Sequence, residues 1–265
     1  MKNSIFLNSI KAISVAGSLL MGAIVTGAGT SPVKPHSHAA TRVNNIVLVH
    51  GAWADGSGWE GVYKILKGKG YNVTVVSNPN TSLAEDVRIT KAVLAQQDGP
   101  VILVGHSYGG AIITEAGDES IVKGLVYVAA FAPDAGESLF KMQQGAPADP
   151  NSPVLPPKDG FIWLDRAKFH AAFCADVPAA QADFMAASQV PPGLAAFSTD
   201  LTTAAWKNKK SWYIVSKQDH MIPPDVERSM AKRAGSVVTE IDASHAVYVS
   251  HPAEVAAVIE KAANN

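Results

Sequence analysis

The segment from Pro100 to Gly117, PVILVGHSYGGAIITEAG, limits the possible folds of this chain more than any other part. Its apolar start, Val101 to Val104, is rich in β-branched residues and predicts a strand buried on both faces. The next five residues, GHSYG, match the pattern G-x-S-x-G, and a helix-compatible run follows. Such an elbow presents its serine outward in a strained conformation, while the glycines let two backbone segments pass closely. The segment therefore predicts Ser107 as a nucleophile, with an ordinary glycine-rich turn as the alternative.

Strand and helix patterns alternate along most of the remaining chain. The alternation predicts an α/β fold whose mostly parallel central sheet is flanked by helices. The further strands are expected at residues 45–50, 71–76, 124–131, 211–216 and 236–241, and the helices at 58–69, 82–97, 223–234 and 252–263.

One region, from Pro133 to Trp206, has no convincing strand pattern. It holds a proline-rich stretch and two short helical patterns, at 165–175 and 178–189. We therefore predict a small, mainly helical cap insertion over about 133–206. Its expected place is above the carboxyl ends of the strands, where open α/β sheets bind ligands.

The first 40 residues have the features of an export signal. Lys2 and Lys11 supply positive charge, residues 12–28 are apolar and uncharged, and small residues near 37–40 suit cleavage. We expect a signal peptide and linker over 1–40, one folded domain over 41–265, and a periplasmic or secreted mature protein. An uncleaved N-terminal anchor is the alternative.

The composition excludes several classes of protein. A formal net charge of -1 gives no electrostatic attraction to nucleic acid or to an anionic membrane, so neither is an expected partner. We expect no stable membrane insertion of the mature domain, and the sequence does not specify an oligomeric state. The single cysteine, Cys174, excludes an intramolecular disulfide framework and a cysteine-based zinc site, and is expected to be a buried small side chain.

A serine nucleophile needs a base, and the base needs an acid that orients it. His245 follows the last predicted strand in the loop ASHA, and Asp219 follows the preceding strand in the loop SKQDHMIP. The chain order Ser107, Asp219, His245 is the order found in G-x-S-x-G hydrolases. We therefore predict these three residues as a catalytic triad.

Other histidines and acids fit structural roles better. The alternatives for the base are His106, packed beside the elbow; His170, in the cap; His220, next to Asp219; and His251, at the start of the last helix. The alternatives for the acid are Asp242, at a strand end, and Asp225, in a helix start.

Negative charge that develops on the substrate needs backbone N–H donors. One donor is the residue after the nucleophile, Tyr108. The other is expected in the loop after the first strand, where we choose Ala52, with Trp53 as the near alternative. This chemistry needs no metal and no organic cofactor.

From about residue 43 onward, the chain resembles the α/β-hydrolase superfamily. The segments IVLVHGAW, VILVGHSYGG, VYVAAFAPD, QDHMIP and SHAVYVSHP resemble bacterial esterase-like relatives of the plant methylesterase and hydroxynitrile lyase branch. The resemblance implies the α/β-hydrolase fold, the triad Ser107, Asp219 and His245, and oxyanion donors at Ala52 and Tyr108. The lyases carry a threonine and a lysine where this chain has Gly51 and Ala246, which favours ester hydrolysis over cyanohydrin cleavage.

We therefore expect a serine esterase that forms an acyl-enzyme on small, apolar ester substrates. The alternatives are hydroxynitrile-lyase-like or perhydrolase activity, or a non-catalytic ligand-binding protein on the same fold. Large side chains of the cap either form its own core or line the substrate pocket; they are Phe161, Trp163, Phe169, Phe173, Phe184, Met185, Phe197 and Trp206.

Overall fold

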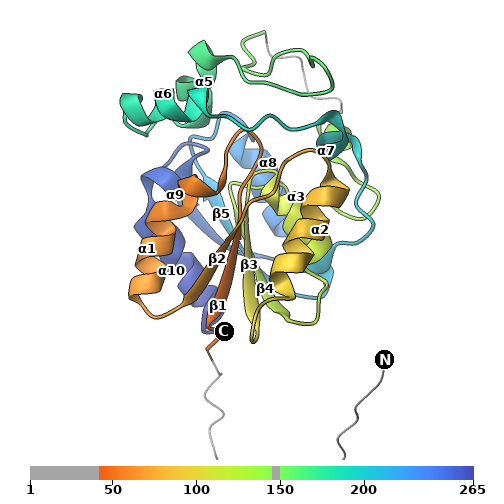
Figure 1. Cartoon of the computed structure of the whole chain (residues 1–265), viewed down its shortest axis with the longest axis vertical. Helices are drawn as coiled ribbons and strands as arrows, with labels where there is room; N and C mark the ends of the chain where they lie inside the picture. Colours follow the sequence, from red (N-terminus) through yellow and green to blue (C-terminus); the bar gives the residue numbers. More distant parts are fainter. Residues whose placement is uncertain (1–41, 145–149) are drawn as a thin grey trace, which may run out of the picture. The chain divides into compact units, whose positions relative to one another are not determined.

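The protein is described by a computed structural model covering residues 42–144 and 150–265. Its centre is a six-stranded sheet with the order β2-β1-β3-β4-β5-β6, and every neighbouring pair is parallel (Figure 1). The strands are β1 (Asn45–Val49), β2 (Asn72–Val76), β3 (Val101–His106), β4 (Val122–Val128), β5 (Lys210–Ser216) and β6 (Val237–Ile241). The predicted α/β class with a parallel sheet is confirmed.

Helices cover both faces of this sheet. α1 (Glu60–Gly68) and α10 (Pro252–Ala263) pack together on one face, and α2 (Leu83–Leu94) and α3 (Gly109–Ala116) on the other (Figure 1). All residues of β1 and β3 are buried, as expected for central strands between two helical layers. The remaining elements outside the cap are the short helices η1 (Gly56–Trp59) and α9 (Val247–Ser250) and the helix α8 (Pro224–Arg233).

The predicted helix starts have clear physical causes. At α2, the Ser82 hydroxyl accepts a hydrogen bond from the Glu85 N–H at 3.2 Å, which satisfies one free donor of the first turn. Pro224 and Pro252 occupy the first positions of α8 and α10, where the missing proline N–H costs nothing. The helix expected over 58–69 instead begins as the tight turn of η1 and continues as α1.

The segment between β4 and β5 forms the cap. It contains α4 (Leu139–Gln143), α5 (Arg166–Phe173), α6 (Ala179–Ala187), α7 (Leu194–Ser198) and η2 (Ala205–Lys207). Its described residues contain isolated bridges, such as Val154 with Leu164, but no strand. α5 and α6 lie beyond the carboxyl ends of the strands (Figure 1), as the sequence predicts. The short helices α4 and α7 were not expected, because helices of about one turn leave little periodicity to detect.

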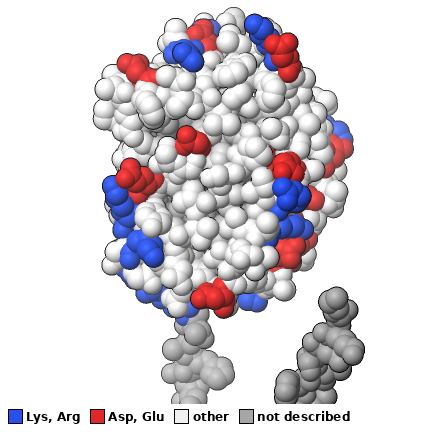
Figure 2. Space-filling model, viewed as in Figure 1, with Lys and Arg blue, Asp and Glu red and all other residues white. Residues whose placement is uncertain are grey.

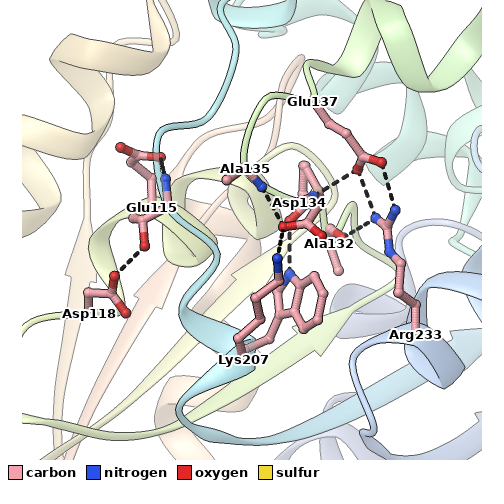
Figure 3. A network of polar contacts seen from close by, with 11 residues as sticks. Glu115, Asp118, Ala132, Asp134, Ala135, Glu137, Lys207 and Arg233 are labelled. Carbon is pink, nitrogen blue, oxygen red and sulfur yellow. Dashed lines mark hydrogen bonds and ion pairs between the residues drawn. The ribbon is translucent and has the colours of Figure 1, made fainter.

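Both ends of the cap are fixed to the core by polar contacts. Arg233 of α8 pairs with Glu137 at 2.7 Å and donates to the Ala132 carbonyl oxygen at 2.8 Å. Lys207, just before β5, pairs with Asp134, just after β4, at 2.5 Å (Figure 3). The residues that leave the sheet and those that return to it are therefore joined directly at the base of the cap.

The predicted signal peptide and linker lie outside the described residues. Within residues 42–144 and 150–265, no helix has the length and apolar character needed to cross a membrane. Over the same residues, no group of histidine, cysteine, aspartate and glutamate side chains is arranged to hold a metal ion.

Candidate active site

Ser107 lies in a sharp turn directly after β3. Its φ is 54°, a left-handed conformation that side chains other than glycine rarely adopt. Three backbone hydrogen bonds hold it there: its N–H donates to Val128 at 3.2 Å, and its carbonyl oxygen accepts from Gly110 at 2.9 Å and Phe131 at 3.1 Å. The surrounding backbone thus fixes the strained conformation.

The glycines of the elbow are required by close backbone contacts. A Cβ atom on Gly105 would lie 2.5 Å from the Gly109 carbonyl oxygen, and one on Gly110 would lie 2.1 Å from the Phe131 carbonyl oxygen. Both distances are shorter than any real Cβ contact. The pattern G-x-S-x-G-G is therefore a packing requirement of this elbow, as well as a sequence motif.

His245 and Asp219 form a buried pair. The Nδ1 atom of His245 lies 2.5 Å from Oδ2 of Asp219. The other carboxylate oxygen of Asp219 accepts from the Met221 N–H at 2.6 Å and the Ile222 N–H at 2.8 Å. With Nδ1–H directed to the carboxylate, Nε2 of the neutral imidazole is the proton acceptor.

The Nε2 atom of His245 is buried and has no hydrogen-bond partner among the described residues. No hydrogen bond joins it to Ser107 within the described chain, although both side chains lie beside His106. Ser107 itself is only 3% exposed. The structure therefore brings Asp219 and His245 into direct contact and leaves the base nitrogen available.

The loop of His245 is held by the cap and by the elbow. The Ala246 N–H donates to the Phe173 carbonyl oxygen at 3.0 Å, and the Ser244 N–H donates to Asp176 at 3.1 Å. Burial, followed by the proximity of His245, holds the pKa of His106 well below its usual range. The neutral His106 ring then donates from Nε2 to the carbonyl oxygen of His245 at 3.0 Å.

Two backbone donors near the elbow are unoccupied. Among the described residues, no acceptor bonds the N–H of Ala52 or of Tyr108. The N–H of Trp53, the alternative to Ala52, donates to the Val190 carbonyl oxygen at 2.9 Å. Tyr108 also precedes α3, so its N–H lies at the positive end of the helix dipole. Of the two candidates after β1, the Ala52 N–H is therefore free within the described chain, whereas the Trp53 N–H is not.

Comparison with known proteins agrees with this architecture. A family model described as "Alpha/beta hydrolase family" matches residues 46–258. The chain belongs to the alpha/beta hydrolase family. The resemblance to this family, inferred from its motifs, is confirmed.

Individual relatives cover most of the chain. A pyrethroid hydrolase of Sphingobium wenxiniae is 30% identical over 82% of this chain and 86% of its own length. Methylesterase 7 of Arabidopsis thaliana is 28% identical over 80% of this chain and 92% of its own length. The crystal structure of polyneuridine aldehyde esterase is similar to this chain with a TM-score of 0.73 and 20% sequence identity. The match spans 83% of this chain and 99% of that chain, and a mutant of the same esterase gives a TM-score of 0.71.

Besides His106, four alternatives for the base and the acid contact other residues, and a fifth, His220, is exposed. His170 contacts the Val177 carbonyl oxygen, His251 contacts Ser250, Asp225 pairs with Arg228, Asp242 accepts from Gln218, and His220 is exposed.

Three buried polar residues near the site were not identified from the sequence. Asn80 donates to the Gly51 carbonyl oxygen, Asp86 accepts from the Tyr108 hydroxyl, and Glu227 lies beside Asp219. One signal was available for Asp86: it falls on the buried face of α2 with Leu83 and Thr90. A carboxylate at an apolar position of a helix indicates a specific polar partner in the interior.

Proposed function

We propose that this alpha/beta hydrolase is a serine carboxylic ester hydrolase with Ser107, Asp219 and His245 as its triad. The observation that carries the proposal is the buried contact between Asp219 and His245 beside an elbow that holds Ser107 at a φ of 54°. The pyrethroid hydrolase and the methylesterase bear names of ester-cleaving enzymes, which supports the same reaction class.

The reaction proceeds in two steps. Nε2 of His245 takes the Ser107 proton as Oγ attacks the ester carbonyl carbon, and the N–H groups of Ala52 and Tyr108 stabilise the oxyanion. His245 returns the proton to the alcohol, which leaves an acyl group on Ser107. A water deprotonated by His245 then attacks this acyl group, the bond between the acyl carbon and Oγ breaks, and His245 returns the proton to Ser107 as the acid leaves. Asp219 holds the imidazole tautomer throughout and stabilises the imidazolium.

The surroundings of the site favour an apolar, uncharged ester. Phe197 of α7 packs against both Trp53 and Tyr108, with ring centroids 5.6 Å apart in each case. In the view of Figure 2, charged side chains gather at the flanks and ends of the molecule and leave most of the middle uncharged. The cap also exposes several large apolar side chains, namely Val154, Leu155, Phe161, Trp163, Phe184 and Leu194.

Cyanohydrin cleavage is the second catalytic candidate, and Gly51 argues against it. A Cβ atom at this position would lie 2.7 Å from the Cβ of Ser107 and 2.9 Å from the His106 carbonyl oxygen. The local backbone thus leaves no room for the threonine that the lyases carry there. Perhydrolase activity uses the same triad, and peroxide added to an ester assay tests for it.

The decisive experiment measures hydrolysis of a short p-nitrophenyl ester by the wild type and by Ser107→Ala. We expect the variant to lose turnover while keeping its circular dichroism spectrum. A fluorophosphonate should label the wild type at Ser107. An unlabelled Ser107 together with ligand binding would instead favour a non-catalytic binding protein.

We also propose export of the mature protein, on the basis of the charge and apolar pattern of residues 1–40. Expression of the full chain in a bacterial host, followed by N-terminal sequencing of the protein in each cell fraction, tests this. A protein that retains Met1 in the cytoplasmic fraction would contradict it.

A further inference from the structure

The peptide group between Gly51 and Ala52 carries one of the two proposed oxyanion donors. In a trans peptide the C=O and N–H bonds point in opposite directions, so fixing the Gly51 carbonyl also fixes the direction of the Ala52 N–H. Two side chains contact this carbonyl oxygen: Nδ2 of Asn80 at 3.3 Å and Nδ1 of His50 at 2.9 Å. Since the oxygen is an acceptor only, both contacts are donated to it.

Tyr108, the residue that carries the second proposed donor, is linked to the same asparagine through its hydroxyl group. The Tyr108 hydroxyl donates to Oδ2 of Asp86 at 2.7 Å, and Oδ1 of Asp86 accepts from the backbone N–H of Asn80 at 2.9 Å. All three residues are buried, with Asn80, Asp86 and Tyr108 each 0% exposed. Asn80 therefore contacts the peptide between Gly51 and Ala52 with its side chain. Its backbone N–H contacts Asp86, which in turn contacts the Tyr108 hydroxyl.

Further contacts fix the orientation of Asn80 itself. Nδ2 of Asn78 donates to Oδ1 of Asn80 at 2.7 Å, which directs Nδ2 of Asn80 toward the carbonyl oxygens of Gly51 and Val190. The φ of Asn80 is 60°, a conformation that asparagine tolerates better than most residues. From the cap, the Gly193 N–H donates to the Asn80 carbonyl oxygen at 2.9 Å.

We propose that Asn80 is a positioning residue that aims both oxyanion donors, Ala52 and Tyr108, at the substrate. This inference rests on the proposed ester hydrolysis. Burial raises the pKa of the Asp86 carboxyl group to about 6, and the hydrogen bonds from Tyr108 and Asn80 oppose the rise. An ionised Asp86 accepts from both partners and makes the connection between them stronger than neutral groups would.

The test uses Asn80→Gly, which keeps a residue suited to a positive φ and removes the side-chain amide. Loss of one oxyanion donor costs about 100- to 1,000-fold in kcat, and a donor that is present but misdirected should cost less. We expect kcat for a p-nitrophenyl ester to fall by about 10- to 100-fold, with KM changed less than about threefold. Affinity for a boronic acid, which forms a tetrahedral adduct with the serine, should fall together with kcat.

Ser82→Ala is the matched control. Ser82 lies two residues further along and caps α2, the helix that carries Asp86, but it contacts neither oxyanion residue. Its loss should lower the urea concentration at the midpoint of unfolding and leave kcat unchanged. Asn80→Asp supplies a second variant, because it keeps the shape of the side chain and replaces the donor by a carboxylate oxygen.

The outcomes separate the two proposals. If the wild type is active and Asn80→Gly keeps its kcat, the role of Asn80 alone is overturned. The same holds if kcat falls equally in Asn80→Gly and Ser82→Ala. A wild type without Ser107-dependent turnover overturns the proposed function. A fall in kcat and boronic acid affinity in both Asn80 variants, with Ser82→Ala unaffected, supports the inference.

Discussion

The Nδ1 atom of His245 lies 2.5 Å from Oδ2 of Asp219, and neither side chain is exposed to solvent. Replacing Asp219 by asparagine keeps the shape but presents an amide that can donate to Nδ1, so the imidazole adopts the wrong tautomer. We expect Asp219→Asn to lower kcat by about 1,000- to 10,000-fold, as in other serine triads. Stopped assays with a p-nitrophenyl ester measure this loss.

The control for that variant is Asp242→Asn. Asp242 is closer to His245 in sequence, but its side chain is exposed and lies 3.8 Å from Lys217. We expect its kcat to stay within about twofold of the wild type, because exposed ion pairs of this kind contribute little. A large loss in Asp242→Asn, with activity kept in Asp219→Asn, would reassign the acid.

The elbow could be predicted from the sequence because its requirements are local. A Cβ atom on Gly105 or Gly110 would lie 2.5 or 2.1 Å from a backbone oxygen, so both positions require glycine. The requirement is therefore visible as a short motif in neighbouring positions of the sequence. The parallel sheet was predictable for a similar reason, since β1 and β3 are buried along their whole length and form short apolar runs.

Asn80 and Glu227 could not be assigned in the same way. The partners of Asn80, Gly51 and Val190, are 29 and 110 residues away, so their contacts exist only after the cap and sheet have assembled. Glu227 occurs in a helix with Asp225 and Arg228 and is indistinguishable by residue type from an exposed acid. Sequence patterns reveal burial by periodicity, but they do not reveal which polar groups meet across the fold.

Gly51 tests how tightly the nucleophile is packed. Because a new Cβ atom there would lie 2.7 Å from the Cβ of Ser107, Gly51→Ala must displace either the serine or the loop that carries Ala52. We expect the free energy of unfolding to fall by about 1–3 kcal/mol and esterase activity to fall at least tenfold. Urea denaturation and the p-nitrophenyl assay measure the two effects.

Gly68→Ala is the matched change for this test. Gly68 ends α1, and a Cβ atom there meets nothing within 4 Å. Alanine at a helical position without steric conflict should leave activity unchanged and stabilise the protein by up to about 1 kcal/mol. If Gly51→Ala behaved like Gly68→Ala, the close packing around Ser107 would not limit the reaction.

Phe197 tests the proposed preference for apolar esters. It is 6% exposed and contacts the rings of both Trp53 and Tyr108. Phe197→Ala should open space against the Trp53 and Tyr108 rings, so we expect longer or branched acyl groups to gain in relative kcat/KM over acetate. A methylene group in an apolar pocket is worth about 1–3 kcal/mol, which corresponds to shifts of about 5- to 150-fold.

The comparison for Phe197 is Val237→Ala, at the start of β6. Val237 is 58% exposed and lies at the amino ends of the parallel strands, opposite Ser107, so its removal should leave the ranking of p-nitrophenyl esters as it is in the wild type. A panel in which acyl length and alcohol are varied separately gives the measurement. An unchanged ranking in Phe197→Ala would place the acyl group elsewhere.

Glu227 has a buried carboxyl group that lies beside Asp219, the proposed triad acid. It is 0% exposed on α8, and one of its oxygens accepts from the Ser216 N–H at 3.1 Å. Burial, followed by the negative charge of Asp219, raises its pKa well above 4.5, whereas Arg228 opposes the rise. The folded protein therefore keeps a proton that the unfolded chain releases above about pH 4.5, so the contribution of Glu227 to wild-type stability falls as the pH rises from there.

Glu227→Gln removes this titration and keeps a neutral side chain of similar shape. Its free energy of unfolding, relative to the wild type, should increase between pH 5 and pH 7.5 in urea denaturation, while kcat changes little. Glu240→Gln gives the opposite sign, because the hydrogen bond from Arg228 lowers the pKa of Glu240 and stabilises the wild type above about pH 4.5. If both variants shifted in the same direction with pH, Glu227 would be ionised in the folded protein and Asp219 would share its site with a second negative charge.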